Sequence, residues 1–313
     1  MTPTEMAKAM ARQPADLERI FADRAPAEAA AERIAGRRVF VVGTGTSWHA
    51  ANLGAYFLRQ AGAEAWAVPA ADAAVWGPRP TAADALVLLS HRGTKRYTKR
   101  VLERARADGV PTVAISGVGA PGADIETVAQ EKAGTFTASH LGALARLAQL
   151  AVSLGADLGE LEGVPPAVAA ALEGPSPRVE VPDRGLDFVG SGPNAWTAAE
   201  GALKAREAAH LFTAGWATEQ LLHGPAWGLG PRDGLVCLDG GGPGAERLAE
   251  LADAIEPRGA RVYRFTATAT AAGEALSVFP LTVVVQRIAL DFALLLGTDP
   301  DNVRPPEWDS IEL

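Results

Sequence analysis

The sequence predicts an α/β protein made of two tandem, doubly wound parallel-sheet subdomains that are related by internal duplication. Short apolar runs rich in β-branched residues alternate with helical stretches, as in parallel strands joined by crossover helices. The pattern then starts again: Gly190 follows Gly43 by 147 positions, and Val262 follows Val113 by 149 positions. This nearly constant offset favours a duplication, although two unrelated α/β halves can also acquire similar spacing.

The first half is expected to form one parallel sheet whose strands are continuous buried runs. These strands are predicted over residues 38–42, 65–68, 85–89 and 111–115, with helices over 48–60, 97–108 and 134–155. The carboxyl ends of parallel strands meet at one edge of a sheet, which is where such folds bind ligands. Ser47 and Ser90 both fall at this edge.

The domain organisation follows from these elements and from shifts in composition. We expect an N-terminal helical segment over residues 1–35, a first subdomain over 36–158 and a second over 185–295. A Pro- and Gly-rich linker over 159–184 joins them, and a tail covers 296–313.

Composition bounds the class of protein. Hydrophobic residues make up 48% of the chain, which is enough for a large core, and the formal net charge of -8 disfavours nucleic acid as a partner. No apolar run is judged long enough to span a bilayer, and the N-terminus lacks the apolar core of a signal peptide. The single cysteine, Cys237, excludes an internal disulfide, and the spacing of the histidines indicates no metal. The sequence therefore predicts a soluble cytoplasmic protein with no cofactor and no membrane or nucleic-acid partner.

The stretch from Glu200 to Pro225 carries the candidate catalytic groups. Glu200, Lys204 and Glu207 fall on one face of a predicted helix and are flanked by Ala and Leu. The stretch closes on His223, which precedes Gly and Pro. A carboxylate, an amine and an imidazole are the groups that move protons next to a carbonyl. The alternative is an exposed helix with ordinary ion pairs between successive turns.

The turns of the first half are candidates for holding an anion. A strand, a Gly-rich turn and a helix make a cradle in which main-chain N–H groups and hydroxyls face a negative group. The equivalent turn of the second half, Asp239–Pro243, offers no cation. The candidate ligand-binding residues are Gly45, Thr46, Ser47, Ser90, His91, Arg92, Gly93, Thr94, Lys95, Ser139 and, from the second half, Glu200.

With these motifs identified, the chain resembles the sugar isomerase (SIS) family, whose subdomains are flavodoxin-like. It is most similar to the double-SIS isomerase half of glucosamine-6-phosphate synthase and to stand-alone phosphosugar isomerases and deglycases. The resemblance rests on GTS at Gly45–Ser47, EGALKxxE at Glu200–Glu207, LxHGP at Leu221–Pro225 and the tail LGTDPDNVRPP at Leu296–Pro306. It implies a cofactor-free aldose–ketose isomerase, or a deglycase or deaminase, that acts on a sugar phosphate or amino-sugar phosphate.

The resemblance also implies roles for individual residues. Glu207 matches the base that moves a proton between C1 and C2 of the open-chain sugar, and Lys204 matches the lysine that assists at the sugar oxygens. His223 matches a ring-opening histidine that reaches into the active site of the partner subunit of a homodimer. Ser47 and Ser90 match residues of the phosphate-binding loops.

The chain departs from the family at several positions. The family's Ser-Gln-Ser-Gly-Glu-Thr loop here contains Arg92 and Lys95, which can hold a phosphate, a carboxylate or a ligand with two anionic groups, or can point to solvent. The family's glutamate before the third loop is not evident, since Gly134–Thr137 stands there, and Trp308 lies near the position of the family's imine-forming lysine. No glutaminase segment is expected before Thr4, so glutamine-dependent synthesis is not predicted. A sugar-phosphate sensor without catalysis is the alternative function.

Overall fold

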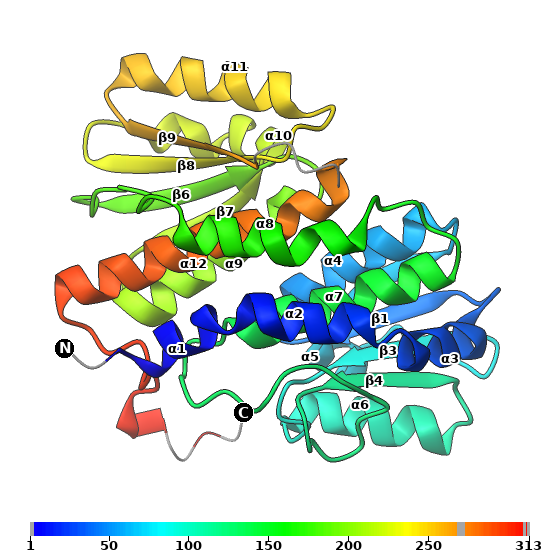
Figure 1. Cartoon of the computed structure of the whole chain (residues 1–313). Helices are drawn as coiled ribbons and strands as arrows, with labels where there is room; N and C mark the ends of the chain where they lie inside the picture. The colour runs from blue at the N-terminus through cyan, green and yellow to red at the C-terminus, as the bar shows by residue number, and fades with distance from the viewer. Residues whose placement is uncertain (1–2, 268–272, 309–310, 312–313) are drawn as a thin grey trace. The chain divides into compact units, whose positions relative to one another are not determined.

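The computed structural model describes residues 3–267, 273–308 and 311 of the chain (Figure 1). Its contacts divide the chain into two compact units. Unit 1 comprises Met1–Ala11, Ala133–Thr135 and Gly163–Val303, and unit 2 comprises Arg12–Lys132, Phe136–Glu162 and Arg304–Leu313. The chain therefore passes from one unit to the other near both of its ends as well as in the middle.

Unit 2 contains a five-stranded parallel sheet in the order β2-β1-β3-β4-β5. Its strands are β1 (Val39–Gly43), β2 (Ala65–Pro69), β3 (Ala85–Leu89), β4 (Thr112–Ser116) and β5 (Ile125–Glu126). β1, β3 and β4 are buried along their whole length, as expected for strands covered on both faces. The four strands predicted for this half are confirmed to within one residue at each end.

Helices cover both faces of this sheet (Figure 1). Unit 2 contains α2 (Gln13–Ala22), α3 (Ala25–Ile34), α4 (Thr46–Gln60), α5 (Ala70–Val75), α6 (Arg96–Ala107) and α7 (Ala138–Ser153). Phe40 and Leu88 face a cluster that includes Ala73 of α5 and Val101 of α6. On the other face α4 packs against α7, which also contacts α2 and α3.

Unit 1 contains a second parallel sheet, in the order β7-β6-β8-β9. Its elements are α1 (Glu5–Ala11), α8 (Val164–Glu173), β6 (Gly185–Gly190), α9 (Asn194–Ala209), β7 (Thr213–Ala217), α10 (Thr218–Leu222), β8 (Asp233–Asp239), α11 (Ala245–Ile255), β9 (Arg261–Thr266) and α12 (Gly273–Leu296). Short 3-10 turns lie at Pro225–Gly228 and Glu256–Arg258 in this unit, at Pro306–Trp308 in unit 2, and at Leu161–Gly163, where the chain passes from unit 2 to unit 1. The fold is therefore doubly wound α/β in both units, as predicted.

The core of unit 1 lies on both faces of this sheet. α9 and α12 cover one face, where Phe188 packs with Ala205 and Val285. α10 and α11 cover the other face, where Cys237 packs with Leu251. Cys237 is buried, and burial raises the pKa of its thiol to about 12, so it is a core residue rather than a nucleophile.

The four strands of the sheet in unit 1 follow the same order as the first four strands of the sheet in unit 2, and the two sheets share one backbone detail. Gly43 and Gly190 each end the first strand of their sheet. A Cβ atom would lie 2.1 Å from the main-chain oxygen of Ser47 at the first position and 2.4 Å from that of Asn194 at the second. In each unit the residue four positions after the glycine makes this close approach, so only glycine fits. This equivalence supports the internal duplication that the sequence predicts.

The predicted N-terminal segment and the predicted linker are both parts of the folded units. The helices of the predicted N-terminal segment divide between the units, because Met6 and Met10 of α1 belong to the core of unit 1 whereas α2 packs on α7 in unit 2. The predicted linker contains α8, whose buried Val164 and Val168 lie on a helix that contacts α12.

The expectation that no apolar run is long enough to span a bilayer was wrong. Within the described residues, α12 has the length and apolar composition of a membrane span, and 67% of its most apolar window is buried inside the protein. Leu281, Ile288 and Phe292 of this helix belong to the core of unit 1. Burial of this extent is what a central core helix shows, so the helix is weak evidence for a membrane span.

Candidate active site

Three charged side chains of α9 form a buried group in unit 1. The ammonium of Lys204 contacts the carboxylate of Glu207 and lies 3.6 Å from that of Glu200. The side chains of Glu200 and Lys204 are 0% and 1% exposed, whereas that of Glu207 is 28% exposed. The alternative of an exposed helix with surface ion pairs is therefore wrong.

A glycine lets α9 pack closely on β6 and α12. A Cβ at Gly201 would lie 2.9 Å from the ring of Phe188 and from Val285, so the helix packs tightly on this side. The helix ends at His210, which adopts the left-handed conformation with φ 56°. Of the three charged groups, Glu207 is the one that a ligand can reach, and Lys204 beside it can stabilise negative charge on an oxygen atom.

His223 lies in the same unit but in a different environment. It follows α10, and its Nε2 atom lies 3.3 Å from the carboxylate of Glu219, which also pairs with Arg247 at 2.5 Å. Gly224 has φ 139°, a conformation that favours glycine and turns the chain directly after the histidine. The side chain of His223 is 78% exposed, so the imidazole is presented to solvent.

The predicted anion cradle lies at the carboxyl edge of the sheet in unit 2. Ser90 is buried at the end of β3, and its Oγ accepts a 3.4 Å hydrogen bond from the hydroxyl of Thr98. α4 and α6 begin just after Gly45 and Lys95, and neither helix receives a side-chain hydrogen bond at its N-cap. The main-chain N–H groups of such helix starts favour an anion.

The start of α7 already binds a carboxylate of the protein itself. Glu131 accepts hydrogen bonds from the main-chain N–H groups of Thr137, Ala138 and Ser139 at 2.8–3.2 Å, and from the Thr137 hydroxyl at 3.1 Å. Sequence analysis did not single out Glu131, although it stands just before Gly134–Thr137. The main-chain N–H of Ser139, a predicted ligand residue, is used by the Glu131 carboxylate.

The structure gives His91 an anchoring position in the loop. Its Nε2 atom accepts a 3.0 Å hydrogen bond from the main-chain N–H of Glu131, and its ring lies edge-on to Phe136 at a centroid distance of 5.3 Å. Burial lowers the pKa of His91, and the nearby Arg92 and Arg12 lower it further against the opposing effect of Glu131. A neutral imidazole is what the accepted hydrogen bond requires.

The loop carries two cations, Arg92 and Lys95. The guanidinium of Arg92 lies 5.3 Å from the centre of the Phe136 ring. Burial lowers the pKa of Lys95, as do the positive charges of Arg92 and Arg304. Within the described residues, neither Arg92 nor Lys95 forms a salt bridge. Sequence analysis missed Arg304, because the C-terminal tail gives no local sign that its last residues belong to unit 2.

The equivalent edge of the sheet in unit 1 has the opposite charge. The carboxylate of Glu274 fills the space beside Gly242, where a Cβ would lie 2.0–2.3 Å from its atoms. Burial raises the pKa of Glu274, and the neighbouring Asp239 raises it further. Two carboxylates at this edge oppose an anionic ligand, so of the two cradles the one in unit 2 suits an anion better.

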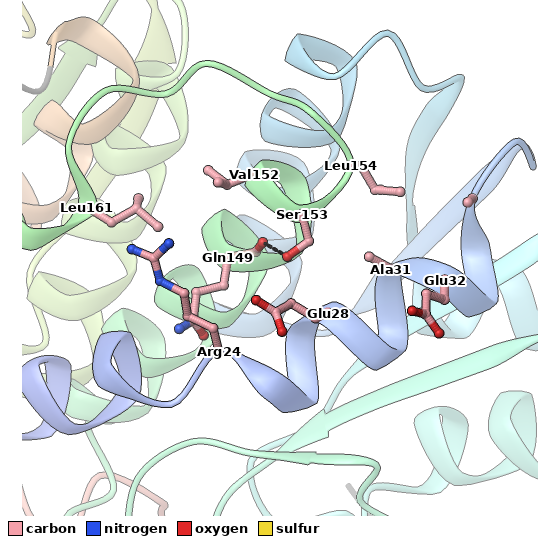
Figure 2. Close-up of a pocket in the computed structure, with 10 residues that line it drawn as sticks. Arg24, Glu28, Ala31, Glu32, Gln149, Val152, Ser153, Leu154 and Leu161 are labelled. Atoms are coloured by element: carbon pink, nitrogen blue, oxygen red, sulfur yellow. Dashed lines mark hydrogen bonds between the residues drawn. The ribbon is translucent and has the colours of Figure 1, made fainter.

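A hollow of about 470 Å³ lies elsewhere in unit 2, and Figure 2 shows the side chains of Arg24, Glu28 and Ser153 around it. α3 and the end of α7 form its walls. None of the predicted ligand-binding or catalytic residues lines it, so its size alone does not make it the candidate site. Among the residues that the structure describes, no group of three or more His, Cys, Asp or Glu side chains is placed to hold a metal ion.

The sequence of the chain matches known proteins. The family model described as SIS domain matches residues 34–152, which covers the sheet of unit 2. A glutamine–fructose-6-phosphate aminotransferase [isomerizing] of Sphingobium yanoikuyae is 31% identical over 139 residues, which is 40% of this chain and 89% of that relative. The chain belongs to the SIS family.

A longer match covers most of this SIS protein. The aminotransferase of the same description from Gloeobacter violaceus is 27% identical over 307 residues, which is 85% of this chain and 50% of that relative. The SIS chain thus spans about half the length of this relative.

Solved structures share the fold of the whole SIS chain. Tagatose-6-phosphate ketose/aldose isomerase from Escherichia coli has a TM-score of 0.78 at 18% identity and covers 97% of this chain and 98% of its own. Glucosamine-6-phosphate deaminase from Thermotoga maritima has a TM-score of 0.77 at 21% identity, with the same coverage. At this identity the likeness shows the fold.

Proposed function

We propose that this SIS protein is a cofactor-free enzyme that binds a sugar phosphate or amino-sugar phosphate and moves a proton between C1 and C2. The observation that carries the proposal is the group of Glu200, Lys204 and Glu207, in which a reachable carboxylate adjoins a buried ammonium. A structural helix does not need two buried charges, since burying them costs free energy. The names of its relatives, which describe isomerising, isomerase and deaminase activities on sugar phosphates, support the same class of reaction.

The roles follow from the chemistry of each group. The hydroxyls of Ser47, Ser90 and Thr94 and the starts of α4 and α6 hold the anionic group. Glu207 removes the proton from the carbon next to the carbonyl, and the electron pair moves to the carbonyl oxygen to give an enediolate, or the corresponding enolamine oxyanion from an amino sugar. Lys204 stabilises the negative charge on that oxygen, which takes up a proton as the hydroxyl or amine of the deprotonated carbon loses one. Glu207 then returns its proton to the carbon that first carried the carbonyl, and the new carbonyl or imine forms at the other carbon.

The test is an assay of turnover with a panel of hexose 6-phosphates, amino-sugar phosphates and fructosamine phosphates. Interconversion of one aldose–ketose pair, or release of an amine from one member, is the expected result. Binding of the panel without any turnover would instead favour the second candidate function.

That second candidate is a sugar-phosphate sensor that keeps the cradle without the chemistry. The observation that favours it is the altered loop, with Arg92 and Lys95, together with Trp308 near the place of the family's imine-forming lysine. A sensor would gain thermal stability with a sugar phosphate and would leave the ligand unchanged.

We further propose that the protein acts as a homodimer in which His223 opens the sugar ring in the active site of the partner subunit. The exposure of its imidazole supports this role, because the group is available to a second molecule. Mixing Glu207→Gln and His223→Ala subunits should restore part of the activity that each variant lacks. Absence of any restoration in mixed dimers would oppose a shared site.

A further inference from the structure

The loop after β3 and the start of α7 are joined through one residue, Glu131. The Nε2 atom of His91 in this loop accepts a 3.0 Å hydrogen bond from the main-chain N–H of Glu131. The buried carboxylate of the same Glu131 accepts hydrogen bonds from the main-chain N–H groups at the start of α7, at 2.8–3.2 Å. The position of the His91 ring is therefore tied to a helix start that is itself fixed.

The other contacts of His91 hold the residue on all sides. Its main-chain oxygen accepts hydrogen bonds from the main-chain N–H of Gly117 at 2.9 Å and from the side-chain amide of Gln130 at 3.1 Å. A Cβ atom at Gly117 would lie 2.6 Å from two atoms of the His91 ring, so the ring packs directly on the main chain there. The Nδ1 atom of the ring is buried. Neither ring nitrogen is therefore open to a ligand.

His91 lies between the parts of the proposed anion cradle. Ser90 precedes it at the end of β3, and the main-chain N–H of Gly93 donates to the Ser90 oxygen at 3.1 Å just before α6 begins. Donors bind an anion best when they are already in place, because a loop that the ligand must order loses conformational entropy on binding. A displaced His91 ring would shift Ser90 through a single peptide bond.

We propose that His91 is a positioning residue of the anion cradle, which contacts Glu131 instead of the ligand and so holds Ser90 and the start of α6 in the geometry that binds an anionic group. The inference rests on the proposed function, since it places that group in the cradle. It gives His91 a role through the loop in place of the direct ligand contact that the sequence suggests.

The experiment measures the affinity for fructose 6-phosphate and glucosamine 6-phosphate by calorimetry in two variants of similar side-chain length. His91→Gln keeps a strong acceptor near the place of Nε2, so its affinity should stay within about threefold of the wild type. His91→Met has only a weak acceptor, so its affinity should fall at least about tenfold. His210→Asn replaces an exposed histidine of unit 1 and should keep the wild-type affinity.

Gly117→Ala tests the same contact without changing His91, because the added methyl group would displace the ring. The affinity should fall at least about fivefold in this variant. Gly163→Ala is the matched control, since a Cβ atom there meets open space, and it should bind as the wild type does. Urea unfolding identifies the variants that are folded, and Gly117→Ala provides the test if His91→Met does not fold.

The outcomes separate this inference from the proposed function. Wild-type affinity in His91→Met or in Gly117→Ala would show that the cradle does not depend on this contact. Equal weakening in His91→Gln and His91→Met would show that the imidazole itself contacts the ligand. Either result would overturn the inference and leave sugar-phosphate binding intact, whereas failure of both ligands to bind the wild type would remove the proposed function and the inference with it.

Discussion

The ammonium of Lys204 lies 3.6 Å from the carboxylate of Glu200, and both side chains are almost completely buried. This pair shares its ammonium with Glu207, which is the more exposed of the two acids. Water cannot screen the two inner charges, so each needs partners inside the protein, and the ion pair supplies one for each. The pair fixes the amine next to Glu207, which is where the proposed chemistry needs it.

Lys204→Met should destabilise the protein by about 3–5 kcal/mol, because it leaves the Glu200 carboxylate buried without its cation. The double variant Glu200→Gln/Lys204→Met should recover part of this loss, since it removes both inner charges. Urea denaturation measures the free energies of unfolding. A Lys204→Met protein as stable as the wild type would show that the pair is not buried as described.

Glu131→Ala should lower the free energy of unfolding by roughly 2 kcal/mol, because the start of α7 loses the carboxylate that accepts its N–H groups. The exposed Glu103 of α6 provides a control, and its replacement by Ala should change stability by less than about 0.5 kcal/mol. Equal effects of the two substitutions in thermal or urea unfolding would contradict the capping role.

His91 predicts a pH dependence of stability. The pKa of His91 is lowered in the folded protein, so on acidification the unfolded chain takes up a proton before the folded protein does. Stability should therefore fall as the pH drops below about 6.5, the value of an unperturbed histidine, and should be flat above it. His91→Asn keeps an acceptor that does not titrate, so the difference between wild type and variant isolates this contribution. A difference that does not vary between pH 5 and 7 would refute the assignment.

The raised pKa of Asp187 leads us to predict that stability falls, rather than rises, with increasing pH. Burial is the main cause that raises the pKa of this carboxyl from 3.8 to about 6, so the folded protein holds the proton more tightly than the unfolded chain. The contribution of Asp187 to the free energy of unfolding therefore falls as the pH rises from about 4 to 6. Above pH 6 the contribution has reached its least favourable value.

Asp187→Asn should therefore be more stable than the wild type by about 1–3 kcal/mol at pH 7.5, with the gain vanishing near pH 4. The exposed Asp183 gives the control Asp183→Asn, which should shift stability by less than about 0.5 kcal/mol. Loss of stability in Asp187→Asn at pH 7.5 would mean that the carboxylate has a favourable partner in the folded protein.

The sequence was sufficient for the elements whose signal is local. The strands are continuous buried runs, so their bounds and parallel pairing could be predicted closely, as at Ala85–Leu89. The face shared by Glu200, Lys204 and Glu207 followed from helical spacing alone. Its burial did not follow from spacing, because it depends on packing against segments that are distant in the sequence.

The residues that the sequence did not reveal act through distant contacts. Glu131 caps α7 from a loop seven residues before Ala138, which is outside the spacing of a capping box. Arg304 joins unit 2 from the end of the chain, and Glu274 enters the second cradle from the start of α12. The apolar length of α12 was underestimated because charged residues such as Arg287 interrupt a run that the helix nevertheless buries.

The most direct test of the central claim is solvent-deuterium exchange into a bound substrate, followed by NMR in the wild type, Glu207→Gln and the exposed control Glu246→Gln. The account predicts deuterium at C1 or C2 of a sugar phosphate with the wild type and the control. It predicts a loss of at least about a hundredfold with Glu207→Gln while that variant still binds the ligand. Undiminished exchange by Glu207→Gln would contradict the assignment of this carboxylate as the base.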